Sequence, residues 1–355
     1  MKLIPFDTPI DRSLLDLSIK NSKNFFSYKG QFPPLLVNNL IDSYYCGGTL
    51  LDPFCGSGTV LYEASKWSIP VIGIDVNISA YLMSRLFILM SYSKTDREFF
   101  IREAFEEAKR DKIAYESKII WEAFFVSKSF HKSLDSSYFS EAILSFPLVT
   151  SSLDVYHTDA RIIPLKNNSV DFIITSPPYI NVLNYHQYLR REVELLGYDV
   201  LSLAYSEIGS NRANRQNRFI TVIQYCIDIE DVLKELYRVC KKDSRLLFII
   251  GKESRVSGVP FYNSDIFSQL AVRSGYFNIL LKQERKFKNR FGNVIYEDIL
   301  HMTPNFGNKT SIAKTVSKEL LIDSKNFVSE KHKTLLEMAL ASIDHIKGTR
   351  VLCQK

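Results

Sequence analysis

Short apolar runs alternate with longer amphipathic stretches along the chain, which is typical of an α/β protein. Seven runs predict β-strands: Thr49–Asp52, Pro70–Asp75, Leu153–His157, Val170–Thr175, Arg245–Ile250, Tyr276–Lys282 and Val294–Met302. Four stretches predict separate helices: Val60–Trp67, Leu183–Leu196, Ile229–Cys240 and Glu330–Ile346. The first two strands and the helix between them form a βαβ unit, which predicts a parallel sheet with a ligand at the carboxyl ends of its strands.

The region from Asn77 to about Phe146 is rich in Glu, Lys, Ala and Leu, contains no glycine and has no proline before Pro147, so it predicts mostly helix. The last two strands, joined through Phe291-Gly292-Asn293, predict an antiparallel hairpin. We therefore expect one α/β core over residues 1–305, with a helical insert at 92–149 and a C-terminal helical extension at 306–355.

Composition places the chain among ordinary globular proteins. It has 355 residues, of which 46% are hydrophobic and 24% are charged, and this excludes a collagen, a coiled coil and a disulfide-rich module. The longest apolar stretch, Ala80–Tyr92, is interrupted by Ser84 and Arg85 and is shorter than the roughly 18 residues that cross a bilayer. The N-terminal residues have Pro5 and Asp7 where a signal peptide needs an apolar core.

The five cysteines are odd in number, scattered and without a C-x-x-C pair, which indicates free thiols and a cytoplasmic location. The six histidines show no metal-ligand spacing, so no metal is expected.

Basic residues exceed acidic residues by 45 − 39 = 6 and gather in two segments. One is Lys282–Arg290, with five basic residues against a single acid, and the other carries Arg212, Arg215 and Arg218. Each segment, taken alone, is either a solvated surface or a surface that binds phosphates.

The first chemical motif is Asp52-Pro53-Phe54-Cys55-Gly56-Ser57-Gly58-Thr59, which follows a strand and opens a helix. A P-loop is excluded because no lysine follows Gly58, and a dinucleotide fingerprint is excluded because position 61 is Leu. A ligand with an adenosine and a carboxylate but no phosphate remains. Asp75, at the end of the next strand, is placed to accept both ribose hydroxyls, although a solvated strand end is the other interpretation. The pattern predicts S-adenosylmethionine.

The second motif is Thr175-Ser176-Pro177-Pro178-Tyr179, directly after the strand that ends at Thr175. Two consecutive prolines stiffen the backbone and remove two donors. A hydroxyl, free carbonyls and an aromatic ring predict a site for a flat ring with an exocyclic amine, in which Ser176 and the Pro177 carbonyl accept from the amine and Tyr179 stacks. The alternative is an ordinary Pro-Pro turn.

Together the two motifs resemble the S-adenosylmethionine-dependent DNA amino-methyltransferases, which modify cytosine N4 or adenine N6. The resemblance covers about residues 25–90 and 153–302, and implies a Rossmann-like seven-stranded sheet with a reversed last hairpin. It also implies further cofactor contacts. Tyr28, Gln31 and Phe32 would close over the methionine end of the cofactor, and Asp159 with Ala160 would meet the adenine amine. The other cofactor contacts are the first-motif residues: Asp52, Pro53, Phe54, Gly56, Ser57, Gly58 and Thr59.

Ser176 favours cytosine N4, because this family usually has Asp or Asn at that position when it modifies adenine N6. Methylation of cytosine C5 needs a nucleophilic cysteine near this motif, and no cysteine lies between Cys55 and Cys226. The alternatives are an adenine-N6 enzyme, an RNA guanine-N2 enzyme and a non-catalytic nucleic-acid-binding subunit.

Duplex DNA is the expected partner, since a flipped base is the only base that reaches such a pocket. Basic side chains would hold its phosphates: Arg212, Arg215, Arg218, Lys286, Lys288 and Arg290. The helical insert is a candidate either for target recognition or for packing. The resemblance suggests a restriction-modification or defence setting with a cognate endonuclease.

Overall fold

The computed structural model describes residues 3–18, 24–28, 30–31, 33–106, 113–128, 134–180, 187, 189–210, 214–289 and 291–352. Its centre is a seven-stranded sheet with the order β3-β2-β1-β4-β5-β9-β8. The strands are β1 Leu50–Asp52, β2 Val71–Asp75, β3 Leu153–His157, β4 Val170–Thr175, β5 Cys240–Gly251, β8 Phe277–Lys288 and β9 Val294–Pro304. All seven predicted strands are present, and the predicted fold is confirmed.

Strands β1 to β5 are parallel, whereas β9 runs antiparallel between β5 and β8. Residues alternate between two cores. Phe172 and Ile174 of β4 belong to one core, and Ile173 between them belongs to the other. Because both faces are covered, the central strands are apolar at nearly every position and not only at alternate ones.

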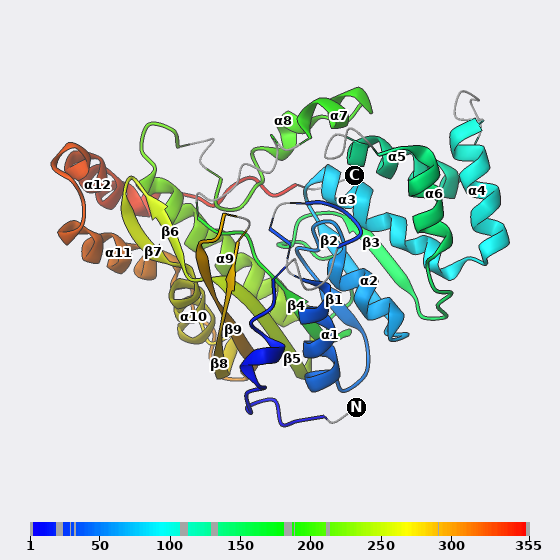
Figure 1. Ribbon diagram of the computed structural model, residues 1–355. Helices are drawn as coiled ribbons and strands as arrows, with labels where there is room; N and C mark the ends of the chain where they lie inside the picture. The colour runs from blue at the N-terminus through cyan, green and yellow to red at the C-terminus, as the bar shows by residue number, and fades with distance from the viewer. Residues whose placement is uncertain are drawn as a thin grey trace.

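Helices cover both faces of the sheet (Figure 1). The first core lies under α1 Pro34–Tyr44, α2 Thr59–Lys66 and α3 Ile78–Ser84, and the second lies under α9 Phe219–Val239 and α10 Asn263–Arg273. The remaining helices are α4 Lys94–Glu106, α5 Tyr115–Lys128, α6 Ser136–Leu144, α7 Arg190–Leu195, α8 Val200–Leu203, α11 Ala313–Asp323 and α12 Glu330–Ser342. Among the described residues, no helix is long and apolar enough to cross a membrane.

The helical insert shares the first core with the sheet. The ring of Phe87 lies in the centre of an aromatic cluster, with centroids 5.6 Å from Phe25, 5.8 Å from Phe26 and 5.8 Å from Phe146. Phe139 of α6 packs against Phe25 of the N-terminal segment in turn. The insert therefore packs against the segment that precedes α1, and its helices are part of the main hydrophobic core.

Several elements differ from the sequence-based expectation. Helix α9 begins at Phe219 and not at Ile229, because its first half buries polar residues such as Thr221 and so hides the apolar period. Cys240, expected to end that helix, begins β5 instead. Four helices were not expected, α1, α8, α10 and α11, and neither was the hairpin of β6 Glu253–Val256 with β7 Val259–Tyr262. In place of the helix expected at 183–196, the described residues contain α7 alone.

We expect Phe87→Ala to lower the free energy of unfolding by about 3–5 kcal/mol, because the large cavity falls at the junction of sheet and insert. Urea unfolding measures the change. Phe99→Ala is the matched control, since Phe99 is 48% exposed on α4. Equal effects of the two substitutions would contradict the central role of Phe87.

Candidate cofactor and catalytic site

The two sequence motifs meet at the carboxyl edge of the sheet. Asp52 is the last residue of β1, and Thr175 is the last residue of its neighbour β4. The Thr175 hydroxyl donates to Asp52 Oδ1 over 2.6 Å, and both side chains are buried. Residues 123 positions apart in the chain are thus joined by one hydrogen bond. The starts of the two motifs therefore lie side by side.

Glycine is required at the turn between β1 and α2. Gly58 has φ of 87°, and a Cβ there would lie 2.8 Å from the ring of Phe87. Gly56 has φ of 52° and faces the ring of Tyr28, 3.5 Å from the position of a Cβ. Pro53 is buried, and Phe54 donates its backbone N–H to Asp52 Oδ1. The chain therefore passes tightly beneath the segment expected to close the cofactor site.

Asp75 lies at the end of β2, and its carboxylate can accept more hydrogen bonds than it receives from the backbone. Its Oδ2 accepts from the Gly56 N–H and its Oδ1 from the Asn77 N–H, each over 2.8 Å. A carboxylate has about four acceptor positions, so one remains on each oxygen. Two remaining positions suit the two hydroxyls of a ribose. Burial raises the pKa of Asp75 to about 6.

The N-terminal segment covers the glycine turn. Gln31 Nε2 hydrogen-bonds to Ser57 Oγ, and the Tyr28 N–H donates to Gln31 Oε1 over 3.0 Å. The Thr59 hydroxyl donates to Asn24 Oδ1 over 2.8 Å. Tyr28 and Gln31 therefore lie beside the first motif. Phe32, the third residue expected there, is outside the described residues.

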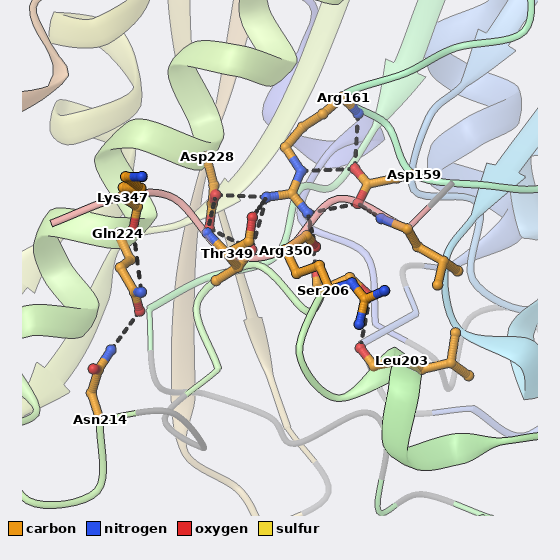
Figure 2. Close-up of polar contacts among 11 residues, drawn as sticks. Asp159, Arg161, Leu203, Ser206, Asn214, Gln224, Asp228, Lys347, Thr349 and Arg350 are labelled. Atoms are coloured by element: carbon orange, nitrogen blue, oxygen red, sulfur yellow. Dashed lines mark hydrogen bonds and ion pairs between the residues drawn. The ribbon is translucent and has the colours of Figure 1, made fainter. Parts of the chain in front are cut away.

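Asp159 has a different environment from the expected one. Its Oδ1 accepts from the N–H and Nε of Arg161, both over 2.9 Å. Its Oδ2 accepts from Arg161 Nη2 over 2.6 Å and from the Leu352 N–H over 3.4 Å. Ala160 is buried beside it. Figure 2 shows the Asp159 and Arg161 side chains in contact, with the chain near Thr349 and Arg350 crossing them.

The second motif forms a directed set of hydrogen bonds. Tyr179 donates its hydroxyl to the Ile249 carbonyl over 3.2 Å, and it lies 2.8 Å from Ser176 Oγ. A phenol has one proton, so when Tyr179 donates to the Ile249 carbonyl, Ser176 is the donor in the second bond. The lone pairs of Ser176 then remain available to accept from an amine.

The main chain of the motif is held from two sides. The Pro178 carbonyl accepts from the Tyr225 hydroxyl over 3.2 Å, whereas no donor among the described residues reaches the Pro177 carbonyl. A Cβ at Gly251 would lie 3.2 Å from the Tyr179 ring, and one at Gly209 would lie 2.5 Å from the Tyr179 carbonyl oxygen. Strand β5 and the loop before α9 thus pack against Tyr179.

The two basic segments contribute less exposed charge than the sequence indicated. Lys282 pairs with Asp265 over 3.0 Å and with Asp298 over 3.1 Å. Arg285 is fully buried and pairs with Glu297 over 3.3 Å. Lys286 and Lys288, at the end of β8, are exposed. Of the described basic residues in this segment, only Lys286 and Lys288 are therefore exposed and outside these ion pairs.

The second basic segment is divided in the same way. Ser206 and Ser210 are buried, whereas Arg215 and Arg218 are exposed. Arg212, like Arg290 of the first segment, lies outside the described residues. Two side chains of this segment are therefore available to a charged ligand.

Three residues that no sequence motif marks also meet at this edge. Arg161, Asp228 and Thr349 form a buried polar cluster with Asp159 (Figure 2). No local pattern marks them, because Asp228 lies inside α9 and Thr349 in the segment after α12. Their contacts join residues that are far apart in the sequence, so they could be identified only from the folded structure.

Groups that bind metal are absent from the described ranges: no cluster of three His, Cys, Asp or Glu residues has suitable geometry there. The described cysteines, Cys46, Cys55, Cys226 and Cys240, are free thiols, as predicted. Cys353 is outside the described residues.

Residues 43–192, a span that includes both motifs, match a family model described as an RMKL-like methyltransferase domain. The chain is 23% identical over 272 residues to the Type II methyltransferase M.BsoBI of Geobacillus stearothermophilus, an alignment over 72% of this chain and 49% of that protein. It is 37% identical over 59 residues to the Type II methyltransferase M.MjaII of Methanocaldococcus jannaschii, over 16% of this chain and 11% of that protein. The matches thus span half or less of the length of these relatives.

Among solved structures, the chain is similar to a SAM-dependent methyltransferase from Methanosarcina mazei. The identity is 13% and the TM-score 0.36, over 74% of this chain and 94% of that one. The sheet order and the family match together define a Rossmann-like methyltransferase domain, and its cofactor is S-adenosylmethionine. The glycine turn and the two remaining acceptor positions of Asp75 fit this group.

We expect the buried Asp52 to make stability depend on pH. Burial raises its pKa to about 7, against about 3.9 in an unfolded chain. The folded state then holds the proton more tightly, so this contribution to stability falls as pH rises from about 4 to 7. Asn keeps the acceptor for Thr175 without the charge, and Asp52→Asn should therefore flatten the decline in the urea midpoint between these pH values.

Asp42→Asn is the control for this experiment, because Asp42 is an exposed acid on α1. A pH profile of Asp52→Asn as steep as that of the unsubstituted protein would contradict the expectation.

Proposed function

We propose that this protein is a DNA methyltransferase that transfers a methyl group from S-adenosylmethionine to the exocyclic N4 of cytosine. The observation that carries the proposal is the hydrogen bond from Thr175 to Asp52. It joins the start of the Ser-Pro-Pro-Tyr motif to the start of the glycine turn, so an amine held by Ser176 would lie close to a cofactor held by Gly56–Thr59.

The residues of the second motif would prepare the amine for attack. The lone pair of an aromatic amine is delocalised into the ring, which makes it a weak nucleophile. Ser176 Oγ and the Pro177 carbonyl would accept hydrogen bonds from the two N4–H groups, draw the nitrogen toward tetrahedral geometry and stabilise its developing positive charge. When bound, S-adenosylmethionine supplies the electrophilic methyl of its sulfonium. As the N–C bond formed, the bond from the sulfonium sulfur to the methyl would break, S-adenosylhomocysteine would leave, and the nitrogen would release one proton to solvent. Holding both groups in line accounts for much of the rate.

The hydrogen bonds of Tyr179 support this role for Ser176. Because the tyrosine proton goes to the Ile249 carbonyl, the Ser176 proton points to Tyr179 and its lone pairs point elsewhere. Tyr179 would thus orient the serine as an acceptor, in addition to stacking on the base. A serine in this position favours cytosine over adenine, for which the resembling family usually has Asp or Asn.

Two further observations support DNA as the substrate. Both curated relatives are named Type II methyltransferases. The exposed side chains of Lys286, Lys288, Arg215 and Arg218 offer positive charge that can neutralise phosphates, and Arg212 and Arg290 adjoin them in sequence. The target base would be flipped out of the duplex, at a cost of a few kcal/mol. Such an enzyme would act in the cytoplasm, in a restriction-modification setting beside a cognate endonuclease.

The deciding experiment supplies labelled S-adenosylmethionine with duplex DNA and, separately, total RNA, then digests each to nucleosides for mass spectrometry. We expect N4-methylcytosine in DNA. N6-methyladenine in DNA would show that the target base is adenine and not cytosine. Label in RNA alone would show that the substrate is RNA and not DNA. Ser176→Ala is run in parallel and should lower turnover on the order of 10²-fold while cofactor binding stays unchanged. Loss of cofactor binding in that variant would contradict the role given to Ser176.

We expect the double variant Lys286→Ala, Lys288→Ala to bind DNA with a smaller salt dependence. The slope of log affinity against log salt should fall by about one per lysine, because each phosphate contact releases a counterion. Lys282→Ala is the matched control, since that lysine already pairs with Asp265 and Asp298. An unchanged slope in the double variant would show that Lys286 and Lys288 are solvated surface residues that do not contact the DNA phosphates.

A further inference from the structure

The C-terminal segment Lys347–Leu352, which we call the strap, returns from the extension to the cofactor side of the sheet. Figure 1 shows it leaving α12 at one end of the molecule and crossing toward β2, β3 and α3. The Arg350 N–H donates to the Tyr205 carbonyl over 3.1 Å, and the Lys347 carbonyl accepts from Gln224 Nε2 over 3.3 Å. Four residues of the strap thus lie between α9 and the loop that packs on Tyr179.

A buried charge cluster anchors the middle of the strap (Figure 2). Arg161, whose side chain is 2% exposed, pairs with Asp228 over 2.6 Å and donates to Thr349 Oγ1 over 2.8 Å and to the Arg350 carbonyl over 3.0 Å. Asp228 accepts from the N–H and the hydroxyl of Thr349, both over 2.9 Å. A Cβ at Gly348 would lie 2.6 Å from Asp228, so the strap approaches too closely for a larger residue.

The end of the strap is held much more weakly. The Leu352 N–H reaches Asp159 Oδ2 at 3.4 Å, and the Leu352 side chain is only partly buried. The other three donors to Asp159 all come from Arg161, at 2.6 to 2.9 Å. A carboxylate has about four acceptor positions, and all four of Asp159 are taken. Leu352 provides the longest of these bonds and the easiest to displace.

We propose that the strap competes with the cofactor: the Leu352 N–H occupies the position on Asp159 that the adenine amine of S-adenosylmethionine takes. Cofactor binding releases Leu352, whereas the Arg161–Asp228–Thr349 anchor stays in place. The inference rests on the proposed function and on the contact of Asp159 with the adenine amine that the family resemblance implies. Because binding equilibria are linked, whatever loosens the end of the strap strengthens cofactor binding, and the cofactor loosens the strap to the same degree.

Leu352→Pro tests the competition, because proline removes the N–H donor. Leu352→Ala is the matched control, since it shortens the same side chain and keeps the donor. Affinity for S-adenosylhomocysteine is measured by calorimetry, which requires no turnover. We expect the proline variant to bind about threefold to tenfold more tightly than the alanine variant, the range given by the net strength of one hydrogen bond. Equal affinities, or weaker binding by the proline variant, would overturn the proposal.

Hydrogen–deuterium exchange of the unsubstituted protein provides a second readout. The Leu352 N–H donates to Asp159 Oδ2 over 3.4 Å, so its exchange rate reports whether the end of the strap is bound while the anchored residues stay in place. We expect S-adenosylhomocysteine to accelerate exchange at this N–H. If the ligand binds but exchange is unchanged or slower, the strap does not compete and the cofactor site stands. If the ligand binds to none of the variants, the proposed function fails together with the strap.

Discussion

The hydrogen bond between Thr175 and Asp52 is the contact on which the site depends. It forms because β1 and β4 are parallel neighbours that end at the same edge of the sheet. Both side chains are buried, so an unpaired partner would carry the desolvation cost of a buried polar group, about 1–3 kcal/mol. The bond therefore couples the start of the glycine turn to the start of the Ser-Pro-Pro-Tyr motif. The role proposed for Ser176 requires the two motifs to lie as close together as this hydrogen bond holds them.

The acceptor positions of two carboxylates distinguish their roles. Asp75 accepts two backbone N–H groups and keeps two positions for a ligand, whereas Asp159 has all four positions filled. Both follow strands at the same edge of the sheet, so their difference comes from neighbours and not from position. Arg161 and the strap make that difference, because together they supply all four donors to Asp159.

The helical insert belongs to the scaffold around Phe87. That ring contacts the N-terminal segment and the end of the insert, and it lies within 2.8 Å of the position that a Cβ on Gly58 would occupy. The packing of the insert is thus connected to the conformation of the glycine turn through one side chain. This arrangement favours a packing role for at least part of the insert.

The sequence by itself determined the seven strands of the main sheet, the two motifs and the free thiols, because apolar period, glycine turns and Pro-Pro steps are local signals. It also led to S-adenosylmethionine through the absence of Lys after Gly58 and of Gly at position 61. Tertiary structure alone decided the environment of each charge. Arg285 and Lys282 looked like a basic arm, but strand pairing places them beside Glu297 and Asp298. Asp159 gained Leu352, 193 residues away, as a partner. Charge and hydrogen-bond capacity depend on which neighbours the fold supplies, and no local pattern contains that information.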